Sequence, residues 1–230
     1  MPTDVHPGHL RSYKLRRGRS TPGQEAALDR LWPQWGIEPG AAPLDLDALF
    51  GRSAPVVLEI GFGMGEATAA MAEAEPDRDV IAVDVHTPGV GALLRDVDAL
   101  GLVNVRIAVG DAVDLLRDRL GPGSLDEVRI FFPDPWPKTR HHKRRLVGPA
   151  FAALVADRLR VGGRWHCATD WTPYAQQILD VVADEPRLEN EHDGWAPRPP
   201  WRPVTRFERQ GLARGHRVHD VLARSVAPGG

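Results

Sequence analysis

The sequence predicts an α/β protein built on a doubly wound, mostly parallel sheet. Short apolar segments alternate with helix-length segments from residue 56 to residue 183, a pattern typical of strand–helix repeats in a parallel sheet. A glycine-rich stretch at 61–65 directly follows the first apolar segment, at the position where open α/β sheets bind ligands. A chain of 230 residues is long enough for one such core with an appendage. We therefore expect a basic N-terminal arm and helix at 1–43 and one domain at 44–230.

The expected elements follow in order along the chain. A first helix starts at Pro22, because Thr21 and Gln24 have the spacing of a capping box, and it runs to about Leu31 and ends before Pro33. The segment 36–55, rich in glycine and proline, is expected to be a connector. Strands are expected at 56–60, 79–83, 104–109, 126–132 and 163–169, and helices at about 66–74, 88–100, 111–119, 145–160 and 172–183. A short strand near residue 188 and a final strand within 216–225 complete the sheet.

Composition places the chain among ordinary globular proteins. Hydrophobic residues make up 42% and charged residues 26%, as in soluble domains. The single cysteine excludes an internal disulfide and fits a reducing compartment. The first residues carry no apolar signal core, and no apolar run is long enough to span a bilayer. We expect a cytoplasmic protein without membrane association.

The net charge of −2 argues against a generic nucleic-acid binder, but the basic residues are clustered. The clusters are Arg11, Lys14, Arg16, Arg17 and Arg19; Lys138, Arg140, Lys143, Arg144 and Arg145; and Arg198, Arg202, Arg206, Arg209, Arg214 and Arg217. Such segregated blocks can present one positive face to a polyanion. The alternative is a set of unrelated solvated charge runs, which is the preferred interpretation for the first cluster taken alone.

The glycine-rich stretch indicates a cofactor site. Glycine occupies every second position after the first strand: Gly61, Gly63 and Gly65. A dinucleotide fingerprint needs a third glycine three positions after the second, and Glu66 stands there. Glu59, inside the strand end, suits a cofactor that carries a cation, such as the amino-acid part of S-adenosylmethionine. The alternative is a tight strand–helix turn with incidental glycines.

Acidic residues follow the next strands, at the edge where ligands bind. Asp84 comes about twenty residues after the last glycine, where an acid accepts the ribose hydroxyls; the weaker alternative is a helix N-cap. Asp111 can accept from an adenine amino group or cap the next helix, and both roles remain open. Asp134 lies among three prolines that stiffen its loop. The adjacent Trp136 offers a face for base stacking, and the alternative is a proline-rich turn with a buried tryptophan.

The last two candidate groups lie after the fifth strand and near the C-terminus. Asp170 is a second carboxylate at the same edge of the sheet. Thr205 and Glu208 have capping-box spacing, and two readings stay open: Glu208 only caps a short helix, or it faces the cleft. The cations at 138–145 suit nucleic-acid phosphates. His141 and His142 lack Cys or acidic partners at metal spacing, so no metal site is expected.

Five segments of this chain together resemble the bacterial tRNA (guanine-N7-)-methyltransferases. They are the segments 58–65, 85–90, 132–145, 168–171 and 205–208, and residues 16–24 are also similar to that family. The resemblance runs from about residue 11 to residue 225. It implies a Rossmann-like class I S-adenosylmethionine-dependent methyltransferase fold with an antiparallel C-terminal strand. It also implies methyl transfer from S-adenosylmethionine to N7 of a guanine in the tRNA variable loop (guanine-46 type), giving 7-methylguanosine. The partner would be tRNA, and the enzyme a monomer or weak homodimer.

The resemblance also assigns roles to individual residues. Cofactor binding would involve Glu59, Asp84, Asp111 and Asp134, with Asp134 at the catalytic centre. The loop pattern adds Gly61, Gly63 and Gly65 to this predicted cofactor site. Substrate binding would involve Lys138, Asp170, Thr205, Arg206, Phe207 and Glu208. Apart from the resemblance, the clustered cations predict contacts to tRNA phosphates at Arg16, Arg17, Arg19, Arg140, Lys143, Arg144 and Arg145. Asp84 stands where many members have Glu, and Arg206 replaces a common Lys.

Guanine N7 carries a lone pair and no proton, so the predicted transfer needs positioning and charge stabilisation rather than a general base. A cation on both O6 and N7 would block the nucleophile. We therefore expect Asp170 or Glu208 to hold the opposite guanine edge, with Lys138 at O6 alone. Three alternatives remain: a methyltransferase acting on another RNA base or a small molecule, a non-catalytic RNA-binding module, and, less favoured by the glycine spacing, a dinucleotide oxidoreductase.

Overall fold

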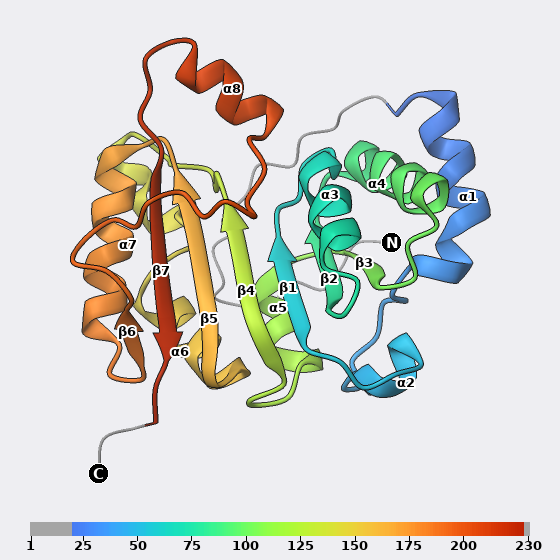
Figure 1. Ribbon diagram of the computed structural model, residues 1–230, viewed down its shortest axis with the longest axis horizontal. Helices are drawn as coiled ribbons and strands as arrows, with labels where there is room; N and C mark the ends of the chain where they lie inside the picture. Colours follow the sequence, from blue (N-terminus) through green and yellow to red (C-terminus); the bar gives the residue numbers. More distant parts are fainter. Residues whose placement is uncertain (1–19, 228–230) are drawn as a thin grey trace.

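The computed structural model describes residues 20–227, and its centre is one mixed sheet (Figure 1). Arg16, Arg17 and Arg19, expected to contact phosphates, lie outside the described residues. The strands are β1 (Val56–Ile60), β2 (Asp79–Asp84), β3 (Val105–Val109), β4 (Leu125–Phe131), β5 (Leu159–Thr169), β6 (Leu188–Asn190) and β7 (His219–Ser225). Their order is β3-β2-β1-β4-β5-β7-β6. Strands β1 to β5 pair in parallel, and β7 pairs antiparallel with both β5 and β6. The expected doubly wound sheet with an antiparallel C-terminal strand is therefore confirmed.

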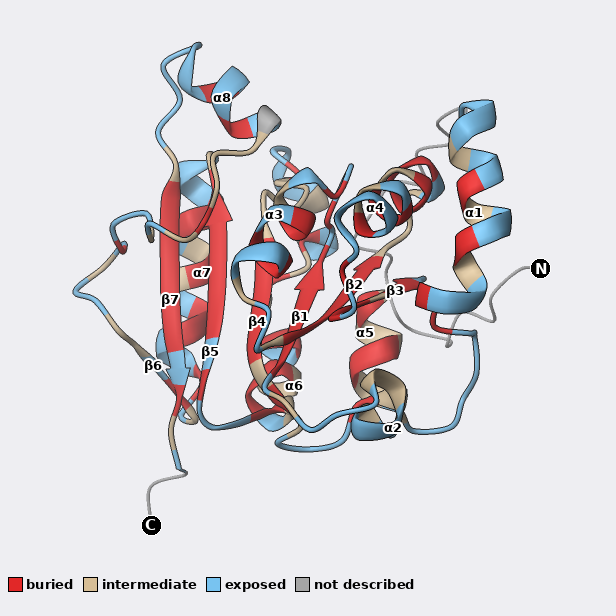
Figure 2. Ribbon diagram, turned by 45° about the vertical axis from the view of Figure 1, so that its right-hand side comes forward, coloured by how far each residue is buried: buried red, intermediate tan, exposed pale blue. Residues whose placement is uncertain are grey.

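Helices cover both faces of the sheet. They are α1 (Pro22–Trp35), α2 (Leu46–Phe50), α3 (Glu66–Ala74), α4 (Thr87–Leu100), α5 (Ala112–Asp114), α6 (Pro149–Arg158), α7 (Thr172–Asp184) and α8 (Arg206–Leu212). Helices α1, α3 and α4 lie on one face, α5, α6 and α7 on the other, and α8 stands above the carboxyl ends of β4 and β5 (Figure 1). The central strands β1, β2 and β4 are almost wholly buried between the two layers (Figure 2), whereas β5 is exposed at 160–162 and 164.

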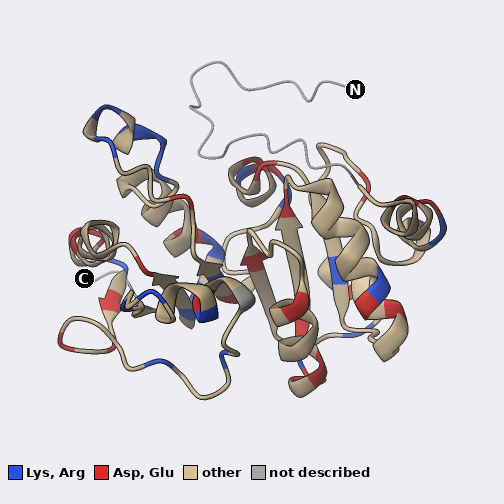
Figure 3. Cartoon of the chain, turned by 90° about the horizontal axis from the view of Figure 1, so that it is seen from above, with Lys and Arg blue, Asp and Glu red and all other residues tan. Residues whose placement is uncertain are grey.

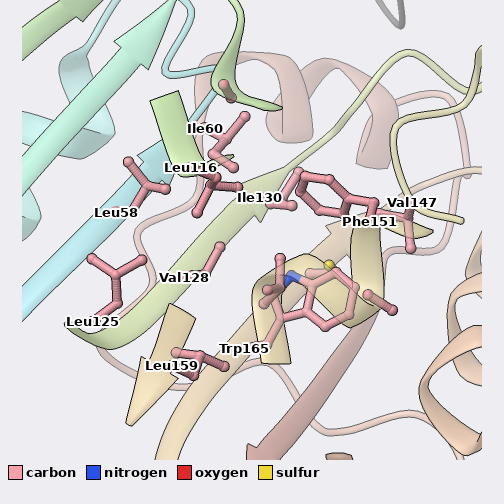
Figure 4. Packing of buried hydrophobic residues seen from close by; sticks show 14 of the residues in the cluster. Leu58, Ile60, Leu116, Leu125, Val128, Ile130, Val147, Phe151, Leu159 and Trp165 are labelled. Atoms are coloured by element: carbon pink, nitrogen blue, oxygen red, sulfur yellow. The ribbon is translucent and has the colours of Figure 1, made fainter. Parts of the chain in front are cut away.

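Alternation of side chains along each strand separates two cores. Val57 packs in the cluster that includes residues of α1, α3 and α4. Leu58 and Ile60 belong to the second cluster, together with Phe151 and Trp165 (Figure 4). Each such fully buried apolar side chain contributes roughly 1.5–3 kcal/mol of transfer free energy. The two cores hold the sheet rigidly, so the loops at its carboxyl edge have a fixed base.

The first helix is longer than the sequence predicts. It passes through Pro33 and ends at Trp35, although an internal proline removes a backbone hydrogen bond. Trp35 is buried, and its indole Nε1 donates to the Leu102 carbonyl at 3.0 Å. Gly36 then bridges to Ile107 of β3. These tertiary contacts outweigh the local cost of the proline, so the expected end before Pro33 was wrong.

Other helices also begin or end at residues that differ from the predicted ones. The segment expected to be a connector contains α2, which Asp45 caps through Ala48 N and which ends at left-handed Gly51. Helix α6 starts only at Pro149, a residue suited to a first helical turn. A 3-10 helix occupies residues 139–144 instead, and α5 continues as a π-helical turn at 115–119. Within residues 20–227, no helix has the length and apolarity needed to cross a membrane.

Candidate active site

The glycine loop after β1 leaves open space beside the sheet edge. Gly61 (φ 79°) and Gly63 (φ 62°) adopt left-handed conformations, and a Cβ on either would meet no atom within 4 Å. Gly65 differs, because its Cβ would lie 2.6 Å from the Leu93 Cβ of α4. Gly89 of α4 likewise approaches the loop so closely that a Cβ would lie 1.7 Å from Gly63 O. Gly61 and Gly63 thus line a space that a ligand can fill, whereas Gly65 serves helix packing.

Glu59 supplies a buried carboxylate next to this loop. The residue is 4% exposed, and its Oε2 atom has no hydrogen-bond partner among the described residues. Burial raises the pKa of Glu59 to about 7, against the opposing effect of the nearby Arg129 guanidinium. An unpartnered buried oxygen is costly unless a donor reaches it. The site therefore fits the cationic amino-acid part of S-adenosylmethionine.

Asp84 ends β2 and is fixed by the backbone. Its Oδ2 accepts from Gly63 N at 2.8 Å, and its Oδ1 accepts from His86 N at 2.9 Å. A carboxylate has about four acceptor positions, so both oxygens can still accept ribose hydroxyls. The N-cap of α4 is His86 rather than Asp84, and the capping alternative for Asp84 was wrong.

Asp111 does act as a helix cap. Its side chain accepts from Val113 N at 2.9 Å at the start of α5. The two roles that the sequence left open can coexist, because one carboxylate oxygen is enough for the cap. A contact to adenine remains a proposal.

The loop after β4 is held in an unusual conformation around Asp134. Phe132 (φ 54°) and Trp136 (φ 41°) are both left-handed, which costs about 1–3 kcal/mol per residue for side chains other than glycine. Arg145 clamps this loop by donating from Nε to the Pro135 carbonyl at 2.8 Å. Such strain persists only where the surroundings over-determine it, and it is concentrated at functional sites. The conformation supports a functional role for Asp134.

Trp136 does not offer the stacking face that the sequence suggested. The residue is 5% exposed. The Arg144 guanidinium lies 4.9 Å from its ring centroid, and His141 meets it edge-on at 5.7 Å. The alternative of a proline-rich turn with a buried tryptophan is confirmed.

Two other aromatic residues are exposed after β5 and on α8. Phe207 is 56% exposed and packs against Phe132 with ring centroids 5.3 Å apart. Trp171, directly after Asp170, is 38% exposed. Phe207 was a predicted site residue and Trp171 was not, although its position directly after a strand-end acid was an available signal.

Arg145 does not fit the expected phosphate contact. The residue is 8% exposed, and its Nη1 donates to Gln177 Oε1 at 2.6 Å while the guanidinium covers the Tyr174 ring. Its cation is therefore turned into the protein, because the neighbouring helix α7 supplies its partners. The remaining basic residues of the segment are exposed: Lys138, Arg140, Lys143 and Arg144.

Asp170 and Glu208, the two candidates for the guanine edge, lie in different environments. Asp170 follows β5, and its Oδ2 lies 2.9 Å from His216 Nδ1, with its side chain 18% exposed. Glu208 is 2% exposed, and both of its oxygens accept from Arg202, at 2.7 and 3.0 Å. Thr205 Oγ1 accepts from Glu208 N, so Thr205 caps α8 as predicted. The Glu208 side chain binds Arg202 instead of completing the capping box. The idea that Glu208 faces the cleft was wrong.

His216 and Arg202 were not predicted from the sequence as site residues. His216 pairs with Asp170, 46 positions away, and Arg202 pairs with Asp220, 18 positions away. Neither pair forms a pattern that is visible in the local sequence. Arg206 begins α8, and its side chain lies outside the described part of the structure.

Strand order arranges the candidate residues in a row at the carboxyl edge of the sheet. Asp111 follows β3, Asp84 is the last residue of β2, and the glycine loop follows β1. Asp134 then follows β4, and Asp170 follows β5. Viewed from above, acidic positions appear among these strand ends (Figure 3). The chain reverses its winding direction between β1 and β4, which is where open α/β sheets bind ligands. No group of three His, Cys, Asp or Glu residues in the described ranges could hold a metal ion.

Comparison with known proteins identifies the family. A family model described as "Putative methyltransferase" matches residues 53–221. A tRNA (guanine-N(7)-)-methyltransferase of Streptomyces avermitilis is 59% identical over 95% of this chain and 76% of its own length. The corresponding enzyme of Paracidovorax citrulli is 53% identical over 98% of this chain and 91% of its own length. The chain belongs to the tRNA (guanine-N(7)-)-methyltransferase family.

Solved structures agree with this methyltransferase fold. TrmN from Thermus thermophilus superposes with a TM-score of 0.55 at 17% identity, covering 88% of this chain and 48% of TrmN. A SAM-dependent O-methyltransferase from Thermotoga maritima gives 0.51 at 17% identity, covering 77% of this chain and 62% of that one. At these identities the likeness shows the fold alone.

Proposed function

We propose that the protein transfers a methyl group from S-adenosylmethionine to N7 of a guanine in tRNA, giving 7-methylguanosine. Membership of the tRNA (guanine-N(7)-)-methyltransferase family carries the proposal. The open glycine loop beside the unpartnered Glu59 oxygen supports the cofactor. By extension from the sequence resemblance, the target would be the guanine-46 type position of the variable loop, and the protein would act in the cytoplasm as a monomer or weak homodimer.

The proposed cofactor site extends along β1, β2 and β3. Glu59 would accept from the amino group, since its buried oxygen needs a donor. Gly61 and Gly63 would let the cofactor approach the backbone. Asp84 and Asp111 would accept from the ribose and adenine, respectively. When bound, the cofactor supplies an electrophilic methyl group on a positively charged sulfur.

The proposed chemistry needs no general base from this chain, because guanine N7 attacks through a free lone pair. Positive charge moves onto the purine as the new bond forms. The rigid loop would place the Asp134 carboxylate beside the ring, where its charge favours the transition state over the ground state. Asp134 is therefore the proposed catalytic residue.

Asp170 is the better candidate for holding the guanine. Its partly exposed carboxylate could accept from N1–H and the exocyclic amine, which leaves N7 free for attack. His216 would fix its orientation. Lys138 could reach O6, while Thr205 and Phe207 would shape the α8 side of the site. Because Glu208 is already paired with Arg202, its proposed substrate contact is limited to its backbone and its helix.

The exposed basic segment is proposed to contact tRNA phosphates. Arg140, Lys143 and Arg144 are exposed next to the Asp134 loop. Each phosphate contact made by such a cation would steepen the salt dependence of tRNA binding. A small-molecule methyltransferase would have no use for this segment.

The proposal is tested by labelled methyl transfer to bulk tRNA, followed by mapping of the methylated nucleotide in one purified tRNA. The wild type should label N7 of guanine, and Asp134→Ala should abolish turnover. Asp184→Ala is the matched control, because Asp184 is an exposed aspartate at the far end of α7. Label on another base or on a small molecule only, or full activity of Asp134→Ala, would contradict the proposal. Absence of S-adenosylmethionine binding in calorimetry would favour a non-catalytic RNA-binding module.

A further inference from the structure

Arg202 lies at the centre of a buried polar network that joins distant parts of the chain. The residue is fully buried, at 0% exposure. It belongs to the proline-rich segment 197–203, between β6 and α8, and its neighbour Trp201 packs edge-on against His166 of β5. The network thus lies over the half of the sheet formed by β4, β5 and β7.

The guanidinium of Arg202 binds two carboxylates at once. Nη1 and Nη2 donate to Glu208 of α8 at 2.7 and 3.0 Å. Nε and Nη2 donate to Asp220 of β7 at 2.9 and 3.2 Å. Both carboxylates are 2% exposed, and His166 Nε2 lies 2.7 Å from Asp220 Oδ1. Only a planar guanidinium presents enough donors in a fixed fork to serve both partners.

The same guanidinium also lies over the entry to the Asp134 loop. Its central carbon is 5.7 Å from the Phe131 ring centroid and 5.9 Å from that of Phe132. Phe132 in turn packs against the exposed Phe207. Arg202 therefore touches α8, β7 and the end of β4, the three pieces that meet on the proposed substrate side.

We infer that Arg202 is a positioning residue that fixes α8 against the loop carrying Asp134, and so sets the geometry in which tRNA is held. The inference rests on the proposed function. Arg202 is too deeply buried to touch the substrate, so it acts through Glu208 and the Phe132–Phe207 contact. Helix α8 spans only seven residues, too short to hold its place without tertiary contacts.

A purely structural role is a separate explanation. Buried ion pairs often add little to stability compared with well-packed apolar residues, although breaking one side of a pair is strongly destabilising. If the network serves positioning, variants that replace it should still fold but should have a higher KM for tRNA. The two explanations differ in which measured quantity changes.

The test compares Arg202→Lys and the double variant Arg202→Met/Glu208→Met with wild type. Lysine keeps the charge but cannot bind both carboxylates as a fork. The double variant removes both members of the Arg202–Glu208 pair and leaves Asp220 with His166 as its partner. Arg224→Met is the matched control, because Arg224 lies at the other end of β7 and is 53% exposed in its pair with Glu189. The measurements are KM for tRNA, kcat, calorimetric Kd for S-adenosylmethionine, and hydrogen exchange of peptide 204–214.

We expect KM for tRNA to rise at least tenfold in both Arg202 variants, with faster exchange in 204–214 and a cofactor Kd within twofold of wild type. Arg224→Met should match wild type throughout. Unchanged tRNA kinetics in an active, folded Arg202 variant would overturn the inference. So would a loss of cofactor affinity in proportion to the loss of activity, since that indicates general unfolding. If the wild type itself fails to methylate tRNA guanine, it is the proposed function that fails.

Discussion

Substitution of Glu59 by Gln should stabilise the cofactor-free protein and weaken cofactor binding. Burial raises the pKa of Glu59 from 4.5 to about 7, so the ionised side chain is unfavourable in the folded state. A shift of this size corresponds to about 3 kcal/mol of folding free energy at high pH. Gln has nearly the same shape and no charge, so it removes this cost.

The direction in which stability changes with pH follows from the difference in proton binding between the folded and unfolded states. Between pH 4.5 and about 7 the folded state keeps the Glu59 proton while the unfolded state has lost it, so the wild type loses stability as pH rises through this window. Below pH 4.5 the carboxyl is protonated in both states. The stability gain of Glu59→Gln should therefore be near zero at pH 4.5 and reach about 3 kcal/mol at pH 8.

Urea unfolding at several pH values measures the gain in stability, with Glu73→Gln, at an exposed position of helix α3, as the control. Calorimetry at pH 8 should show weaker S-adenosylmethionine binding for Glu59→Gln, since the cation would lose its carboxylate partner. A variant that is less stable than wild type at pH 8, or a gain independent of pH, would refute the electrostatic reasoning. Unchanged cofactor affinity would remove Glu59 from the proposed cofactor site.

Three further outcomes are expected. Gly61→Ala and Gly51→Ala should each cost about 1–2 kcal/mol, because both positions have positive φ (79° and 72°) and open space around the new Cβ. Only Gly61→Ala should also weaken S-adenosylmethionine binding in calorimetry, and equal binding by both variants would contradict the open-loop argument. Asp170→Asn should lower kcat/KM for tRNA by about tenfold or more, since charged hydrogen bonds contribute roughly 1.5–3 kcal/mol, with cofactor Kd unchanged; methylation at the full rate would show the assignment to be wrong. Arg145→Met, which releases the clamped loop, should lower kcat, whereas Lys143→Met should raise KM and flatten its salt dependence; the reverse pattern in steady-state kinetics would count against both roles.

Much of the scaffold could be predicted because its signals are local. The apolar segment before Gly61 predicted β1 with the bounds that the structure has, and α3 likewise. The basic stretch at 138–145 was correctly predicted as an exposed cationic surface only in part, since its last residue, Arg145, turns inward toward Gln177. Hydrophobic periodicity and glycine spacing extend over a few residues, so they can be interpreted without knowledge of the rest of the fold.

The misassigned residues share a different cause. Pro33 stays within α1, where Trp35 donates to the Leu102 carbonyl, and Trp136 is buried, with Arg144 and His141 against its ring. In each case a side-chain contact that the sequence pattern does not reveal accompanies the outcome. Propensity and charge describe what a residue prefers in isolation, and tertiary packing overrides preferences of about 1–3 kcal/mol.

Local sequence alone specifies the strand–loop–helix units of this protein and puts a carboxylate at or shortly after the carboxyl end of each central strand. Strand order then brings those carboxylates into one row, and long-range pairing decides which charges face a ligand and which face the protein. Glu208 illustrates both levels. Its backbone N–H donates to the cap residue Thr205, three positions away, which the local sequence predicts, whereas its carboxylate accepts from buried Arg202, which only the tertiary structure shows. A charge can be buried only where it has a partner. For Arg202 the second partner is Asp220 in β7, the last strand along the chain, so only the assembled sheet brings the two together.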